Sequence, residues 1–172
     1  MMRNIRKVLV LCALFLMSAL AAPVPAHADS YPNVRIEASV LGNGSLRVVE
    51  TRAFRFDDDG NGVYWTIPLA SNEQGAASSV AIDGVMVDDG EARVFTQVPS
   101  AELGNDGVYT VEQARGTCRL MVYAPHAEDD VQLVSVGYTI TGAVMAWEDT
   151  AELYWQFVGA DWQDDSEDVE LV

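Results

Sequence analysis

Apolar and polar residues alternate at every second position through most of the chain after residue 33, and this period of two most constrains the fold. Such alternation places the apolar side chains of a segment on one face, as in a strand of a half-buried sheet. The segments that show it are Val34–Leu41, Leu46–Phe56, Val80–Val87, Glu91–Val98, Gly107–Gln113, Thr117–Tyr123 and Val131–Gly142. No comparable segment has the 3.6-residue period of an amphipathic helix. The sequence therefore predicts an all-β fold.

Turn-forming residues join these segments in pairs. Gly42–Ser45, Asp88–Gly90 and Ala114–Gly116 each lie between two alternating segments, which is the signal of a β-hairpin. Strands that follow one another about every ten residues are typical of a β-sandwich. We therefore predict an antiparallel β-sandwich that is immunoglobulin-like in architecture, although the Cys…Trp…Cys core of immunoglobulin domains is missing.

Two segments near the C-terminus are further predicted strands. Ala151–Gly159 places Leu153, Trp155 and Phe157 on one face, and Asp168–Val172 has the pattern of a strand that is just beginning. A domain that stopped there would leave a sheet edge unpaired. We therefore expect the sandwich to be incomplete at its C-terminus and the chain to be a fragment of a longer protein.

Residues 1–28 have the organisation of a secretory signal peptide. Three basic residues precede the apolar run Val8–Ala22, which is shorter than the ~20 residues that a membrane-spanning helix needs. Ala26–Ala28 then supplies small residues at a cleavage site. We expect export to the extracellular space or the outer face of the cytoplasmic membrane, a mature chain that begins at Asp29, and one β-sandwich domain over residues 29–172.

The chain is strongly acidic. It has 26 Asp and Glu residues against 10 Lys and Arg residues, which gives a formal net charge of −16. A charge of this sign favours solubility and repels nucleic acid and anionic lipid headgroups. We therefore expect no nucleic-acid partner, and membrane association only if membrane helices follow Val172 in a longer chain.

Residue types that carry hydrolytic or metal chemistry are scarce. After the signal peptide the chain has one histidine, His126, and one cysteine, Cys118, whose alternation with Leu120 and Val122 predicts a buried thiol. No serine lies in a G-x-S-x-G elbow, phosphate-loop and dinucleotide motifs are absent, and a zinc site needs three or four ligands. We therefore predict no catalytic residues, no cofactor and no enzymatic activity.

The stretch "DDDGNG" is the strongest local candidate for a metal site. Asp57, Asp59 and Asn61 occupy the first, third and fifth positions of an EF-hand-type calcium loop, and a glycine occupies the sixth. Position 12 falls on Pro68, which cannot supply the bidentate carboxylate of such a loop. We interpret the stretch as a charged turn between two strands, unless an acid from a neighbouring loop replaces the missing ligand.

Aromatic and acidic residues support further hypotheses about binding. In a β-sandwich most tryptophans pack in the core, but exposed ones could form a stacking platform for sugars. The four tryptophans are Trp65, Trp147, Trp155 and Trp162. The C-terminal acids Asp161, Asp164, Asp165, Glu167 and Asp168 are typical of a solvated loop rather than of an acid/base pair.

Three stretches follow the signal peptide in order: "GNGSLRVVETRAFRF", "GNGVYWTIP" and "VGYTITGAVMAWEDTAELYWQFVGADW". From Val34 to Trp162 they resemble the N-terminal domain of domain-of-unknown-function family 2207, a family of predicted bacterial membrane proteins. The most specific part is Asp149–Trp155 with Gly159 and Trp162. The resemblance implies an exported β-rich domain followed by membrane helices, with no established activity, substrate or cofactor. One departure is Trp65, which stands where the family pattern has arginine.

These observations together predict a non-enzymatic, exported β-sandwich that acts as a binding or assembly module at the cell envelope. An envelope protein or a glycan is the expected partner. The alternatives are a calcium-dependent or glycan-binding module and an envelope hydrolase that uses two carboxylates.

Overall fold

The computed structural model describes residues 30–69, 79–114, 116–153, 155–157 and 168–172. The predicted signal peptide, Trp162 and all of the C-terminal acids except Asp168 lie outside these ranges. Every element of regular secondary structure within these ranges is a β-strand, so the predicted all-β class is confirmed.

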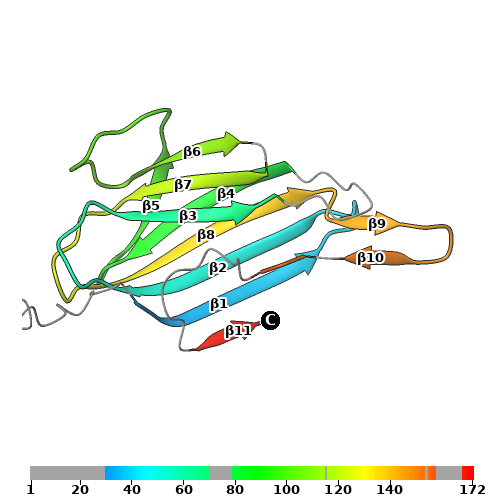
Figure 1. The fold of residues 1–172 in the computed structure, drawn as a ribbon, viewed down its shortest axis with the longest axis horizontal. Helices are drawn as coiled ribbons and strands as arrows, with labels where there is room; N and C mark the ends of the chain where they lie inside the picture. Colours follow the sequence, from blue (N-terminus) through cyan, green and yellow to red (C-terminus); the bar gives the residue numbers. More distant parts are fainter. Residues whose placement is uncertain (1–29, 70–78, 115, 154, 158–167) are drawn as a thin grey trace, which may run out of the picture.

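Nine of the strands form one sheet, and two short ones form a separate ribbon (Figure 1). The strands of the described part are β1 (Ser30–Val40), β2 (Leu46–Arg55), β3 (Val63–Pro68), β4 (Ser79–Asp88), β5 (Ala92–Gln97), β6 (Val108–Ala114), β7 (Thr117–Tyr123), β8 (Val131–Thr141), β9 (Val144–Ala146), β10 (Ala151–Leu153) and β11 (Val169–Leu171). The order in the large sheet is β11-β1-β2-β8-β4-β5-β6-β7-β3. The ribbon consists of β9 and β10.

The three predicted hairpins are confirmed. Strands β1 and β2, β4 and β5, and β6 and β7 are adjacent antiparallel pairs joined by the predicted turns. Strand β8 lies between β2 and β4 and pairs antiparallel with both. Local turn residues therefore determine three of the eight neighbouring pairs in the large sheet of the described part.

Two pairs of strands are parallel, which the sequence did not predict. Strand β5 pairs with β6, and the C-terminal strand β11 pairs with β1. Through the β5–β6 pair, the wing formed by β6, β7 and β3 joins the larger wing in one curled, mixed sheet. The expected immunoglobulin-like sandwich of two antiparallel sheets is therefore not confirmed.

The core lies between the two wings of the curled sheet. The rings of Phe54 on β2 and Trp65 on β3 are 6.2 Å apart, although these strands are far from each other in the sheet order. The face predicted for β8 is confirmed, since its alternate side chains from residue 134 to residue 140 are buried. The curl thus lets one sheet cover its own apolar face, as two sheets do in a sandwich.

The segment after β8 departs from the predicted strand over Ala151–Gly159. In the described part the strand extends only over Ala151–Leu153, where it pairs with β9. Leu153 is exposed, whereas Trp155 and Phe157 are partly buried and pack against the core. The prediction that these three residues share one face of a strand is therefore wrong, because the strand ends after the first of them.

Cys118 on β7 is a free, fully buried cysteine, as predicted, and burial raises the pKa of its thiol. In a Cys12→Ser chain we expect native Cys118 to resist a thiol reagent such as Ellman's reagent and to react fully in denaturant. A cysteine introduced in place of Val94, which is 81% exposed, is the reactive control. Equal rates for the two thiols in native protein would contradict the buried position.

Candidate functional site

The loop between β2 and β3 is bound to the loop that follows β7. Gly60 and His126 exchange two backbone hydrogen bonds of 3.0 and 3.1 Å. The Phe56 amide donates to the Asp130 carbonyl, and the Phe56 carbonyl accepts from the Asp129 amide. The segment that resembled a calcium loop is therefore one half of a hydrogen-bonded junction between two loops.

The predicted metal candidates Asp57, Asp59 and Asn61 lie in this junction. An Asp59 carboxylate oxygen accepts a hydrogen bond of 2.9 Å from the backbone amide of Glu128. Among the described residues, no three His, Cys, Asp or Glu side chains come together as a metal site would require. The geometry gives Asp59 a part in joining the two loops.

His126 is packed between an aromatic ring and a glycine. Its imidazole stacks on Phe56 with 3.4 Å between ring centroids and 10° between the planes. On Gly60, an added Cβ would lie 2.2 Å from the His126 Nε2 atom. His126 Nδ1 also lies 3.1 Å from the Ala124 carbonyl oxygen. Gly60 is therefore needed for the close approach of the imidazole, and His126 serves packing.

An ion pair lies inside the core. Glu50 and Arg52 are two residues apart on β2 and are 2% and 4% exposed. The Arg52 Nε and Nη2 atoms lie 2.8 and 2.7 Å from the Glu50 Oε1 atom. Two contacts on one carboxylate oxygen hold both charges in a fixed geometry.

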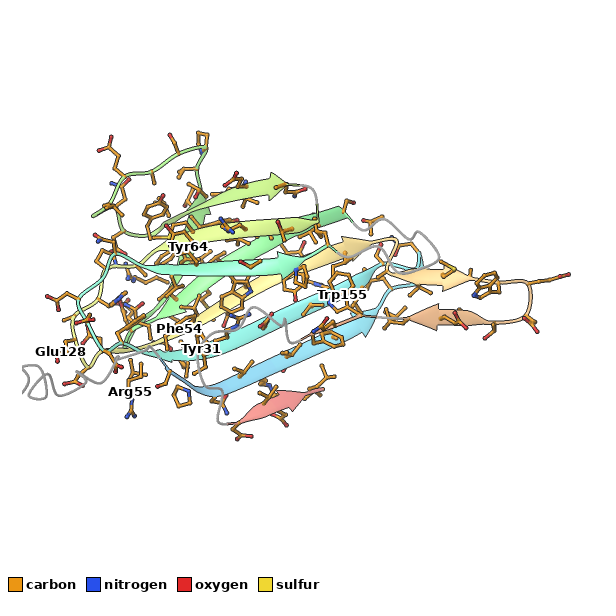
Figure 2. All side chains as sticks on the ribbon, viewed as in Figure 1. Tyr31, Phe54, Arg55, Tyr64, Glu128 and Trp155 are labelled. Carbon is orange, nitrogen blue, oxygen red and sulfur yellow. The ribbon has the colours of Figure 1, made fainter. Side chains whose placement is uncertain are left out.

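Aromatic side chains from three other strands surround this pair. The Arg52 guanidinium carbon is 3.8 Å from the ring centroid of Trp65 and 5.7 Å from that of Tyr31. The Tyr138 hydroxyl donates to the other Glu50 oxygen at 3.3 Å. Tyr31 also meets Phe54 edge-on, with 4.9 Å between centroids, and both are labelled in Figure 2. Arg52 thus connects β2 to β3 across the core.

Burial dominates the electrostatics of this cluster. It raises the pKa of Glu50, while the nearby Arg52 charge and the hydrogen bonds of Arg52 and Tyr138 oppose that shift. The Trp65 indole N–H lacks a hydrogen bond of good geometry in the described part, yet it lies near enough to Glu50 to favour the charged carboxylate. Burial, followed by the Glu50 charge, also raises the pKa of Tyr138.

The buried pair was missed in the sequence, although a signal for it was present. The alternation of β2 places Glu50 and Arg52 on the same face as Leu46, Val48 and Phe54. Two charges of opposite sign on an otherwise apolar face indicate a buried pair, because a lone charge there would be too costly. The arrangement stabilises the contact between the wings rather than offering groups to a substrate.

Trp65 is only 1% exposed, so the idea that it could stack on a sugar from solvent is wrong. Trp65 stands where the pattern of the family has arginine. The indole there instead packs on the guanidinium of Arg52, which reaches it from the opposite wing.

The other aromatic residues divide between core and surface. Trp147 follows β9, is 51% exposed and donates its backbone amide to the Thr150 carbonyl. Tyr64 on β3 is 68% exposed. The motif Asp149–Trp155, the most specific part of the resemblance, thus contributes to the β9–β10 ribbon and to the edge of the core.

Of the predicted C-terminal acids, the structure describes Asp168. Its backbone carbonyl accepts a hydrogen bond from the Val34 amide at 2.8 Å, so it takes part in the β1–β11 pairing. No helix within the described ranges has the length and apolarity needed to cross a bilayer.

Comparison with known proteins gives one informative match. The family described as "Predicted membrane protein (DUF2207) N-terminal domain" matches residues 30–172. No curated protein matches the chain. A solved structure described as a candidate protease from Parabacteroides distasonis is similar over 65% of this chain and 22% of that chain. Its sequence identity of 11% and TM-score of 0.34 are too low to support any argument.

The family match extends beyond both ends of the stretch on which the resemblance was based. It includes β1 from Ser30 and the C-terminal strand β11. The chain therefore belongs to the family of predicted membrane proteins that share the DUF2207 N-terminal domain.

Proposed function

We propose that this chain is a non-enzymatic, exported domain that acts as a binding or assembly module at the cell envelope, on the outer face of the membrane. The observation that carries the proposal is the edge of the large sheet formed by β11. An exposed edge can pair with an extended segment of another chain through backbone hydrogen bonds.

Strand β11 directs part of its peptide groups away from β1, its neighbour in the described part of the sheet. The Asp168 carbonyl, the Val172 amide and the Val172 carbonyl all bond to β1. Because alternate residues of a strand direct their peptide groups to opposite sides, those of Val169 and Leu171 point away from β1. Strand β11 is the last strand of the sheet in the described part, so these groups are available to a further strand.

The opposite edge of the sheet is protected at the end of β3. The Leu69 amide donates to the Gly116 carbonyl on the β7 side, so the preceding residue, Pro68, directs its nitrogen toward the free side of β3. A proline there has no N–H to offer a new strand, which is a common protection of natural sheet edges. Strand β11 has no proline, lysine or bulge, and its Val169 and Leu171 side chains are exposed.

The described ionisable groups support a non-enzymatic role. Glu50 and Arg52 are buried against aromatic rings, and the imidazole of His126 is occupied by Phe56 and Gly60. A general acid or base must reach the proton it transfers; Glu50 and Arg52 lie inside the core, and the partly buried His126 ring is stacked on Phe56.

A proline scan of β11 tests the proposal. Leu171→Pro removes an outward N–H and leaves the β1 ladder intact, whereas Val172→Pro removes the 2.9 Å bond to the Ile36 carbonyl. We expect the wild-type chain, extracted from envelopes in mild detergent, to elute in a complex larger than itself, and Leu171→Pro to elute at a smaller size because it lacks the partner bound at β11. Val172→Pro, which weakens the pairing of β11 with β1, is the control that shows how a chain with a detached β11 elutes. Elution of the wild-type chain in free form would contradict the proposal.

A further inference from the structure

The β9–β10 ribbon extends beyond one end of the large sheet (Figure 1). Its register pairs Ala151 with Ala146 and Leu153 with Val144. Because directly opposed residues share a face, these four side chains make one face of the ribbon entirely apolar. Leu153 on this face is 42% exposed, so the face is largely uncovered.

The tip of the ribbon holds an exposed tryptophan. A hydrogen bond of 2.8 Å from the Trp147 amide to the Thr150 carbonyl closes the turn, and half of the Trp147 surface is open to solvent. A hydrogen bond from the Val144 amide to the Gly44 carbonyl ties the base of the ribbon to the β1–β2 turn. An isolated two-stranded ribbon is marginally stable in water, and a large exposed aromatic side chain is typical of a binding anchor.

Acidic side chains surround this aromatic tip. Glu148 and Asp149 follow Trp147 directly, and Glu152 lies opposite Met145 on the second strand. The segment 143–153 contains no Lys or Arg. The tip therefore combines one large apolar anchor with three negative charges on a short, projecting element.

We propose that the β9–β10 tip inserts Trp147 into an apolar pocket rimmed by Arg or Lys on a protein partner. This inference rests on the proposed binding role but uses a surface distinct from the β11 edge. The charges decide between the possible occupants. A second copy would bring three more acids against the same tip, and a bilayer surface with anionic lipids would repel them. A basic rim gives each carboxylate a partner of opposite sign.

Site-specific photo-cross-linking tests this inference in full-length chain in cells. A photoreactive phenylalanine derivative replaces Trp147, with the same group at the exposed Tyr64 as the matched control. We expect one discrete protein adduct from position 147 and none of that mass from position 64. The cross-linked partner peptide should contain apolar residues next to Arg or Lys.

Two further variants, a charge reversal at the tip and a proline in β11, test which surface holds the partner. Glu148→Lys combined with Asp149→Lys should reduce the adduct at least tenfold, while Leu171→Pro should leave it unchanged. Loss of the adduct in Leu171→Pro would show that the β11 edge, rather than the tip, holds the partner. An adduct of the chain with itself, a Trp147-dependent adduct with lipid, an adduct insensitive to charge reversal, or no adduct would each overturn the inference.

Discussion

Glu50→Gln is expected to lower the free energy of unfolding by about 3–5 kcal/mol, because it removes the charged carboxylate that contacts the buried Arg52 guanidinium. Arg52 is 4% exposed, so water has little access to its side chain and cannot take the place of the Glu50 carboxylate. Urea denaturation followed by tryptophan fluorescence measures the loss, since Trp65 lies on the Arg52 guanidinium.

Strand β1 offers a matched control. Arg35 and Glu37 have the same spacing of two residues and a contact of 2.9 Å, but their side chains are 46% and 53% exposed. Glu37→Gln should therefore change the unfolding free energy by less than about 1 kcal/mol. Equal losses from Glu37→Gln and Glu50→Gln would show that burial does not govern the cost.

Removing both buried charges should restore most of the stability. In Glu50→Leu/Arg52→Met, apolar side chains of similar volume replace the pair, a change that is often neutral or stabilising. A double variant as unstable as Glu50→Gln would mean that the pair contributes more than charge compensation, for example through the Tyr138 hydrogen bond.

The loss of stability in Arg52→Met, the variant that removes the other partner of the pair, should depend on pH. Burial raises the pKa of Glu50 above its ordinary value of 4.5, and the Arg52 charge opposes that shift. In Arg52→Met the pKa of Glu50 in the folded state rises further above its value in the unfolded state. The contribution of Glu50 to stability is therefore fully present below about pH 4.5 and is lost as the pH rises through the folded-state pKa. The cost of Arg52→Met should therefore be smaller at pH 4.5 than at pH 7.

The strands and hairpins could be predicted from the sequence because they follow from local patterns. Alternation on β8 identified the buried face that includes Tyr138, and the turn residues identified three antiparallel pairs. The parallel pairs could not be predicted in this way. The β5–β6 pair depends on the path of the connection 98–107, and the β1–β11 pair joins segments at opposite ends of the described chain.

The buried pair on β2 shows a different limit of sequence reasoning. Glu50 and Arg52 share the inner face of β2 with apolar residues, but charged residues on a strand are ordinarily taken as exposed, so the pair was not predicted. Whether they are buried depends on what covers them, and the cover is Trp65 from a strand in the other wing. That contact exists only because the sheet curls.

Gly62→Ala is expected to destabilise the fold by about 3–5 kcal/mol, through backbone strain and overpacking acting together. Gly62 has a φ of 141°, a conformation that favours glycine. An added Cβ would lie 1.9 Å from the Val122 carbonyl oxygen and 2.9 Å from the Ala124 amide nitrogen. Both are backbone atoms of the neighbouring chain segment, so no side-chain rotation can relieve the contact.

Two other glycines separate this effect from a general loss of flexibility. Gly42→Ala, where an added Cβ has no neighbour within 4 Å, should change stability by less than about 0.5 kcal/mol. Gly60→Ala places its Cβ 2.2 Å from the His126 Nε2 atom, so adding His126→Ala should recover part of its loss. The same His126→Ala change should not rescue Gly62→Ala. If Gly62→Ala were as mild as Gly42→Ala, the close approach of β3 to β7 would be wrong, and with it the account of "DDDGNG" as a turn that needs its glycines for packing.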